Sequence, residues 1–175
     1  MSRISWDEYF LSVMDATALR ASCDRGKSAA VIVKDNRILA TGYVGAPSGL
    51  PSCDEIGHQL VKRCEIPIDE WEDALYVFNN SKANLINADK FTTHCIRTVH
   101  AETNAIVNCA RNGVSTLGAT MYCTMVPCRI CAMMIIQAGI KSVIARNKYQ
   151  KDAETREMFK LAGVHLEILN EKELY

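Results

Sequence analysis

The sequence predicts an α/β fold with parallel strand pairing and helices on both faces of the sheet. Helical and strand-like segments alternate over the second half of the chain, and such an order pairs strands in parallel through helical connections. Two short apolar runs upstream have the length and spacing of a β-hairpin. The 175 residues are enough for one domain with its own core, so a single domain over residues 1–175 is expected.

The first half of the chain is expected to hold one helix and the hairpin. Ser5 and Glu8 have the spacing of a capping box, and Asp35-Asn36 is a turn signal between the two apolar runs. Residues of about 59–92 form an insertion of uncertain structure, in which a helix around Trp71–Phe78 could form. The expected elements are a helix over residues 5–20, strands over 29–34 and 37–43, and a Gly- and Pro-rich loop over 42–58.

Glycines and one proline mark the ends of the helices expected in the second half. Pro127 suits the first turn of a helix, while Gly113, Gly139 and Gly163 each follow a periodic apolar segment. The expected order is helix 101–111, strand 119–124, helix 127–139, strand 142–146, helix 152–162 and strand 165–169.

Charge and hydropathy argue against two large classes of partner. Lys+Arg and Asp+Glu both number 20, so the net charge is zero, whereas nucleic-acid binders usually carry a basic excess. No apolar run reaches the roughly 18 residues of a membrane span, and the first ten residues lack the apolar core of a signal peptide. We therefore expect a cytoplasmic protein that binds neither nucleic acid nor membrane, and whose ligand is small.

Two short motifs bring together residue types that bind zinc. His100-Ala101-Glu102 opens one expected helix, and Pro127-Cys128-Arg129-Ile130-Cys131 opens another. Cysteines three residues apart lie on one helix face, and a helix N-terminus favours ionised sulfur. His100, Cys128 and Cys131 would supply three ligands and leave the fourth tetrahedral position for water, as in catalytic zinc sites.

Glu102 fits the role of proton carrier at such a site. It lies two residues past His100, about 200° around the helix, which places it beside the metal and not on the ligand's own face. A carboxylate there can take a proton from the activated water and pass it to a ring nitrogen and a leaving amine. The pairing of HxE with PCxxC is typical of zinc nucleobase deaminases. The alternative is a closed structural zinc with Cys123 or Cys109 as fourth ligand.

Longer segments extend this likeness over most of the chain. They are ISWDEYF, AVIVKDNRILATGY, GAPSGLPSC, HCIRTVHAETNAI, ARNGVSTLGATMY and PCRICAMMIIQAGIKSVI. In them the chain resembles the deoxycytidylate (dCMP) deaminase family of the cytidine deaminase-like superfamily, including its late-competence-operon members. The resemblance implies a three-layer α/β/α sandwich around a five-stranded mixed sheet, with the last two strands parallel. It also implies zinc-dependent hydrolysis of dCMP to dUMP and ammonia, which feeds thymidylate synthesis.

The resemblance further implies regulation and substrate contacts. Family members are typically hexamers, and many are activated by dCTP with Mg²⁺ and inhibited by dTTP. Ala101, Pro127 and Tyr149 fall at positions near the family's pocket, although Tyr149 could equally be a rim aromatic. Arg25 and Lys27 are candidate phosphate donors, with a solvated charge pair as the alternative.

Val44 departs from the family pattern. The family usually reads GYNG, whereas this chain reads Gly42-Tyr43-Val44-Gly45, and the replaced asparagine contacts the sugar in the family. Valine cannot make that hydrogen bond. In the family a stretch that reads QVGA or RVGA lines the same wall of the substrate pocket, and this chain has Lys27-Ser28-Ala29-Ala30 there. A 5-substituted dCMP is therefore an alternative substrate, and weakened activity is another outcome.

A second, structural zinc is also implied by the resemblance, because family members often carry cysteines at corresponding positions. The predicted Cys₃His ligand set is Cys23, Cys53, His58 and Cys95. His58 stands where the family has cysteine, and His94 or Cys64 are alternatives for this ligand. Buried free thiols are the alternative to the whole site.

Two other functions stay open at this point. A tRNA or single-stranded polynucleotide deaminase would need a basic groove with stacking aromatics, which the zero net charge and 7% aromatic content disfavour. The second open function is that of a non-catalytic zinc-binding protein related to the family. Val44, which replaces the family asparagine, keeps this alternative open.

Overall fold

The structure is a computed structural model that describes residues 3–64, 91–149 and 152–173. The chain divides into two compact units, a larger one of Met1–Ile56 with Thr98–Tyr175 and a smaller one of Gly57–Arg97. The helix expected around residues 71–78 lies outside the described residues. The single domain expected from the sequence stays a prediction.

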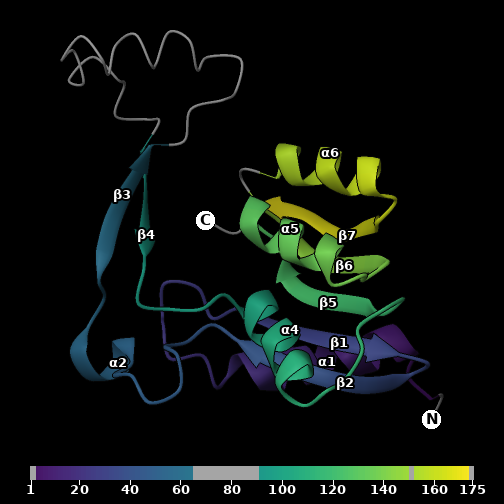
Figure 1. Ribbon diagram of the computed structural model, residues 1–175, viewed down its shortest axis with the longest axis horizontal. Helices are drawn as coiled ribbons and strands as arrows, with labels where there is room; N and C mark the ends of the chain where they lie inside the picture. The colour runs from purple at the N-terminus through teal and green to yellow at the C-terminus, as the bar shows by residue number, and fades with distance from the viewer. Residues whose placement is uncertain (1–2, 65–90, 150–151, 174–175) are drawn as a thin grey trace, which may run out of the picture. The chain divides into compact units, whose positions relative to one another are not determined.

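A five-stranded mixed sheet with the order β2-β1-β5-β6-β7 forms the centre of the larger unit (Figure 1). Its strands are β1 (Ala29–Lys34), β2 (Arg37–Tyr43), β5 (Thr120–Met125), β6 (Ser142–Lys148) and β7 (His165–Glu173). β1 pairs antiparallel with β2 and β5, whereas β5, β6 and β7 run parallel. The predicted fold class, including the parallel last two strands, is confirmed.

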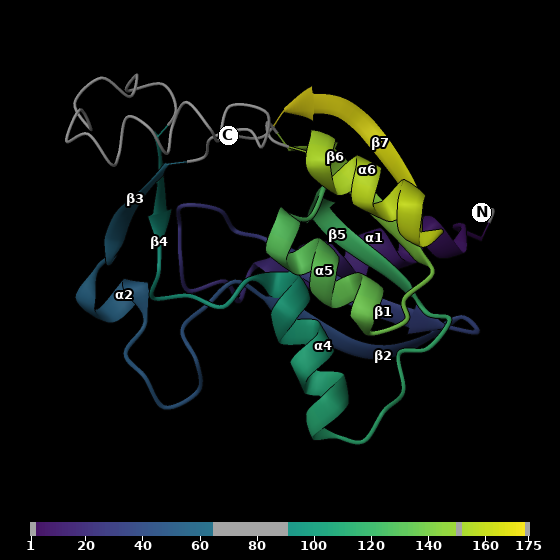
Figure 2. The ribbon, with the colours of Figure 1, turned by 45° about the horizontal axis from the view of Figure 1, so that its top comes forward.

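Helices cover both faces of this sheet and complete three layers (Figure 2). They are α1 (Trp6–Ala18), α4 (Ala101–Arg111), α5 (Arg129–Gln137) and α6 (Ala153–Ala162). α1 covers one face, where Phe10 and Met14 pack on the apolar side chains of β1. The other three helices cover the opposite face, where Ala105, Ile135 and Phe159 join the main core.

Two local signals in the sequence have their predicted structure. The Ser5 hydroxyl accepts a hydrogen bond from the Glu8 amide, and the Glu8 carboxylate accepts one from the Ser5 amide, which closes the capping box of α1. Asp35 and Asn36 have φ values of 51° and 57°, as a two-residue type I′ turn between β1 and β2 requires.

Gly42 allows α4 to approach β2 closely. A Cβ atom at this position would lie 2.2 Å from the carbonyl oxygen of Ala101 and 2.4 Å from the amide nitrogen of Ala105. The side-chain amides of Asn104 and Asn108 donate to the backbone carbonyls of Tyr43 and Thr41, each at 3.0 Å. Together these contacts fix the helix that carries the HxE motif against the edge strand of the sheet.

The structure differs from the sequence prediction in a few places. The loop expected over residues 42–58 contains a short helix, α2 (Cys53–Ile56), whose Glu55 carboxylate accepts from the Ser52 amide at 2.7 Å. The spacing of Ser52 and Glu55 was the available signal for this helix. β6 and β7 extend beyond residues 146 and 169, because backbone pairing continues where the apolar pattern stops.

The smaller unit contains a two-stranded antiparallel sheet. Its strands are β3 (Leu60–Cys64) and β4 (Phe91–Cys95). The Ile96 amide donates to the Gln59 carbonyl at 2.9 Å, and Arg97 Nε donates to the Gly57 carbonyl at 3.0 Å.

In the part of the chain that the structure describes, no helix is both long and apolar enough to cross a membrane.

Candidate active site

The N-termini of α4 and α5 bring the two zinc-binding motifs together. His100 is the N-cap residue of α4, and Cys128 is the N-cap residue of α5, so the prediction that helix α5 begins at Pro127 is off by two residues. Cys131 follows in the first turn of α5. A backbone bridge between Val99 and Gly45 holds the segment that leads into His100.

The three predicted ligand atoms have the spacing of a tetrahedral zinc site. His100 Nδ1 lies 3.5 Å from the sulfur of Cys128 and 3.5 Å from the sulfur of Cys131. Zn–S bonds of about 2.3 Å and Zn–N bonds of about 2.0–2.1 Å at a tetrahedral angle place nitrogen and sulfur about 3.5 Å apart. These residues therefore fit a zinc ion with one imidazole and two thiolate ligands.

The cysteine pair is prepared to lose a proton. The pKa of the Cys128 thiol is lowered, because the Cys131 thiol donates a hydrogen bond to its sulfur and the His100 ring lies beside it. The same hydrogen bond, together with burial, raises the pKa of Cys131. The two sulfurs thus hold one proton tightly between them, which a metal ion has to displace.

Glu102 lies next to the ligand cluster and is buried, with 7% of its surface exposed. Its Oε2 atom lies 3.7 Å from the Cys131 sulfur, which places Glu102 beside the cluster without making it one of the three members. Burial raises the pKa of its carboxyl. A carboxyl with a raised pKa suits a group that both accepts and returns a proton.

Cys109 and Cys123, considered from the sequence as fourth ligands of a closed site, lie in the main core. Burial raises the pKa of both thiols, which favours the protonated form over the thiolate that binds zinc. Among the described residues, the cluster around His100 contains neither of them. Three protein ligands with one open position is the arrangement of a catalytic zinc site.

Two threonines, the buried Thr155 and the half-buried Thr103, support the ligands, and sequence reasoning missed both. The Thr155 hydroxyl on α6 donates to the Pro127 carbonyl at 2.9 Å, and this side chain is fully buried. The Thr103 hydroxyl lies 3.6 Å from the Cys131 sulfur. Thr103 directly follows the HxE motif, but Thr155 has no local signal because its partner lies 28 positions earlier.

The residues predicted to contact substrate occupy three kinds of environment. Val44 follows β2 and is buried, with its backbone bonded to Ser28 and Ser22. Ala101 and Pro127 are buried beside the zinc ligands, and Tyr149 packs against the main core. Arg25 and Lys27 lie at exposed positions of the loop before β1. Their roles as substrate contacts stay predictions.

The residues predicted to hold a second zinc are divided between the two units. Within the larger unit, the sulfurs of Cys23 and Cys53 are buried and lie within 4.8 Å of each other. Within the smaller unit, a ring nitrogen of His58 and the sulfur of Cys95 lie within 4.8 Å of each other. Each unit presents one ligand pair, and a zinc held by all four stays a prediction. His94 is half-buried in β4, and the side chain of Cys64 lies outside the described part.

The fold and the ligand geometry define a zinc-dependent hydrolytic deaminase. Comparison with known families agrees: residues 4–147 match the model of the cytidine and deoxycytidylate deaminase zinc-binding region. The chain belongs to this family.

Individual relatives cover most of the chain. It is 37% identical to ComE operon protein 2 of Bacillus subtilis over 95% of this chain and 72% of that protein. It is 36% identical to the deoxycytidylate deaminase of Mycobacterium phage D29 over 82% of this chain and 96% of that protein. A crystal structure of dCMP deaminase from the cyanophage S-TIM5 with dCMP and dUMP superposes with a TM-score of 0.67 at 27% identity, covering 96% of this chain and 99% of that one.

Proposed function

We propose that the protein hydrolyses the 4-amino group of dCMP and releases dUMP and ammonia. The observation that carries this proposal is the spacing of 3.5 Å from His100 Nδ1 to both cysteine sulfurs, with the buried Glu102 carboxyl beside them. Deoxycytidylate deaminases among the relatives, and the S-TIM5 enzyme with dCMP and dUMP, support the choice of substrate.

The zinc, when bound, supplies a Lewis acid that makes a water molecule acidic near neutral pH. Glu102 is placed to take the proton of this water as its oxygen bonds to C4 of the cytosine ring. The carboxyl passes this proton to the ring nitrogen N3, then takes the remaining proton of the new C4 hydroxyl and passes it to the 4-amino group, so that the C4 carbonyl forms, the C4–N4 bond breaks and ammonia leaves. The raised pKa of the buried Glu102 carboxyl makes this return of the proton easier at neutral pH.

Several finer features belong to the same proposal and rest on the family resemblance. They are a hexameric assembly, activation by dCTP with Mg²⁺, inhibition by dTTP, a cytoplasmic location, and a structural zinc held by Cys23, Cys53, His58 and Cys95. Val44 extends the proposal to 5-substituted dCMP, because a buried valine offers apolar contact and no hydrogen bond at this wall.

The experiment compares zinc-loaded wild type with Glu102→Gln on dCMP, 5-methyl-dCMP, CMP and a cytosine-containing single-stranded oligonucleotide. Ammonia release is measured alongside zinc content. Glu102→Gln should lower kcat on dCMP by at least about 100-fold and keep its zinc, because general acid–base catalysis contributes about 10²–10⁴-fold. The matched control is Glu157→Gln, which removes an exposed carboxylate on α6 and should act like wild type.

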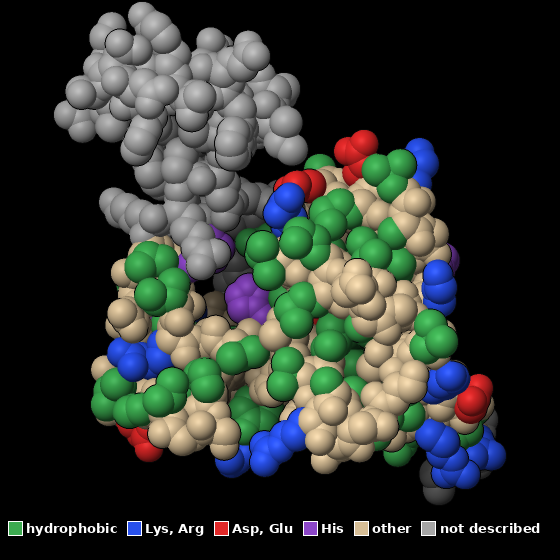
Figure 3. Space-filling model, in the orientation of Figure 1, with side chains coloured by type: hydrophobic (Ala, Val, Ile, Leu, Met, Phe, Trp, Pro, Cys, Tyr) green, Lys and Arg blue, Asp and Glu red, His purple; other side chains and the backbone are tan. Residues whose placement is uncertain are grey.

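The outcomes separate the alternatives. Turnover of the oligonucleotide alone would favour a polynucleotide deaminase. Figure 3 offers little support for this alternative, because the Lys and Arg side chains on the face shown lie in separate small groups. Zinc binding without ammonia release from any substrate would indicate a non-catalytic relative. Full activity of Glu102→Gln would refute the assigned proton carrier.

Val44→Asn tests the proposed wall of the pocket. The variant restores a hydrogen-bonding side chain and should raise kcat/KM on dCMP relative to 5-methyl-dCMP. An unchanged ratio of the two substrates would mean that this position does not contact the substrate.

A further inference from the structure

The two cysteine sulfurs of the zinc cluster have different hydrogen-bond surroundings. The sulfur of Cys128 accepts a hydrogen bond from the backbone amide of Cys131, which belongs to the first turn of α5. Cys131 is buried more deeply, with 1% of the residue exposed, and its sulfur lies 3.6 Å from the hydroxyl oxygen of Thr103 on α4. The side chain that directly follows the HxE motif therefore reaches a zinc ligand on the neighbouring helix.

The Thr103 hydroxyl has one proton and two sulfur atoms within reach. The second sulfur is that of Met134, which lies 3.4 Å from the hydroxyl oxygen. Cys131 and Met134 are three residues apart in α5, so they lie on the same face of that helix. Thr103 itself is half-buried, which limits the access of water to this hydroxyl. The proton can therefore go to either sulfur.

The two sulfurs differ in strength as acceptors when the site is loaded with zinc. A cysteine that ligates zinc is a thiolate, which carries negative charge and can only accept hydrogen bonds. The thioether of Met134 is neutral and a weak acceptor. A hydrogen bond to a charged group is roughly twice as strong as one between neutral groups. The thiolate of Cys131 is therefore the preferred partner of the hydroxyl.

We propose that Thr103 is a positioning residue that strengthens zinc binding by donating a hydrogen bond to the Cys131 thiolate. The bond stabilises the charged form of the sulfur and holds it where the metal needs it. Cys131 is also the ligand next to the proton carrier, with 3.7 Å between its sulfur and Oε2 of Glu102. The position of this sulfur thus sets where the metal lies relative to the carboxyl.

Metal titration of the purified chain measures the contribution of Thr103. All variants carry Cys53→Ser, which removes one ligand of the predicted second site and confines the metal to the site of His100. Zinc affinity is measured by competition with a chelator, and Co²⁺ replaces zinc for absorption spectroscopy. The thiolate-to-cobalt charge-transfer band reports on the sulfur itself, because a hydrogen bond lowers the energy of the sulfur lone pair.

Four residue types at position 103 separate the hydroxyl from the shape of the side chain. Thr103→Val keeps the shape and should weaken zinc binding about tenfold, the lower end of the usual loss for a residue that supports a ligand. Its cobalt band should move to longer wavelength. Thr103→Ser should keep both the affinity and the band position of threonine. Thr103→Ala differs from Thr103→Ser by the hydroxyl alone and should behave like Thr103→Val.

Two further variants are controls. Thr17→Val makes the same change in α1, where the hydroxyl donates to the Val13 carbonyl at 2.8 Å, and it should leave zinc affinity and cobalt band unchanged. Met134→Leu removes the competing sulfur and nearly conserves the volume of the side chain, so zinc should bind as tightly as before or more tightly. A thermal unfolding curve checks that each variant folds.

Three results would overturn the proposal. The first is a zinc affinity of Thr103→Val within about twofold of the Thr17→Val control, since loss of a supporting hydrogen bond costs more than this. The second is a cobalt band that does not move. The third is a loss of affinity in Thr103→Ser or Met134→Leu as large as in Thr103→Val, which would assign the effect to packing. The proposal rests on the zinc site of the proposed function, but the readouts use metal alone, so they decide the role of Thr103 even for a protein inactive on dCMP.

Discussion

Replacing Gly42 with alanine tests whether the close approach of α4 to β2 sets the geometry of the active site. The added Cβ would lie 2.2 Å from the Ala101 carbonyl oxygen, and both of the nearest atoms are backbone atoms that cannot rotate away. Close carbon–oxygen contacts in proteins are about 3.3–3.6 Å, so α4 has to withdraw by about 1 Å. His100 and Glu102 lie at the end of α4 that is pushed.

The expected losses of stability and of activity both follow from this displacement of α4. Overpacking of this kind costs about 1–3 kcal/mol of unfolding free energy. For a chain of this size each kcal/mol shifts Tm by about 2–4 °C, which gives a decrease of about 2–12 °C. A misplacement of about 1 Å in a catalytic constellation can cost about 100-fold in rate, so kcat/KM should fall by about two orders of magnitude.

The assay measures ammonia release from dCMP together with thermal unfolding. Gly163→Ala is the control, since Gly163 has φ of 66° at the end of α6 and an added Cβ there meets no atom within 4 Å. Backbone strain should cost this control about 1–2 kcal/mol, comparable to Gly42→Ala, without displacing α4. A Gly42→Ala enzyme that loses stability but keeps kcat/KM within about threefold of the control would refute the reasoning.

Three further predictions follow from contacts around the site and from the ligand sets. Thr155→Val removes the buried hydrogen bond to the Pro127 carbonyl, and it should lower the unfolding free energy by about 1–3 kcal/mol. It should also weaken zinc binding, measured by competition with a chelator. Thr155→Ser keeps the hydroxyl and should keep both the stability and the zinc affinity of the wild type. An equal loss in the two variants would assign the effect to packing and not to the hydrogen bond. Ser5→Ala removes half of the capping box and should lower the unfolding free energy by about 1 kcal/mol and Tm by about 2–4 °C, with unchanged turnover as the check. Elemental analysis should find two zinc ions per wild-type chain and one in Cys53→Ser, and a single zinc in wild type would contradict the second site.

Local signals account for the parts of the fold that the sequence predicts well. The capping box at Ser5, the Asp35-Asn36 turn and the glycine after α6 each act through contacts within a few residues, so their effect is readable from the sequence alone. The HxE and PCxxC motifs are readable for a related reason, because each places its ligands on one helix N-terminus.

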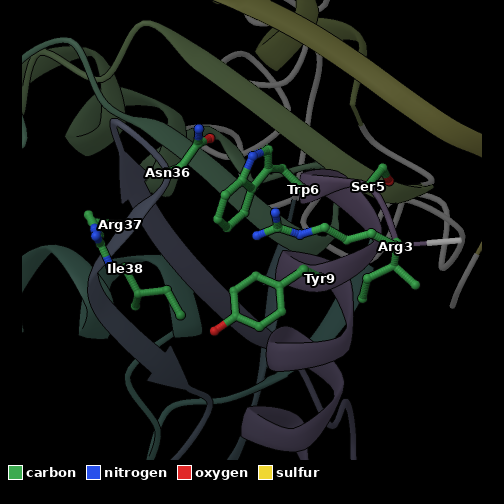
Figure 4. A pocket seen from close by; sticks show the side chains of 8 residues that line it. Arg3, Ser5, Trp6, Tyr9, Asn36, Arg37 and Ile38 are labelled. Carbon is green, nitrogen blue, oxygen red and sulfur yellow. The ribbon is translucent and has the colours of Figure 1, made fainter.

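Contacts between distant segments account for what the sequence does not predict. Thr155 supports the Pro127 carbonyl from another helix, and Gly42 matters only because α4 packs onto β2. The last residues of β6 pair through their backbone, and the Asn147 side chain donates to the Thr124 carbonyl at 2.9 Å, so no apolar alternation marks them. The cavity between the start of α1 and the β1–β2 turn, lined by Trp6, Tyr9 and Ile38 among others (Figure 4), likewise needs the hairpin and the helix to be placed together.

The central place of β5 in the sheet constrains how a growing chain can fold on the ribosome. β1 is apolar along nearly its whole length, and one of its edges pairs with β5. At the end of this pairing the Ala29 amide donates to the Thr124 hydroxyl, and the two residues are 95 positions apart in the sequence. At about 5–20 residues per second, this edge stays unpaired for roughly 5–20 s during synthesis. An open apolar strand edge is a site for pairing with other chains, so protection of nascent β1 during synthesis should raise the yield of folded protein.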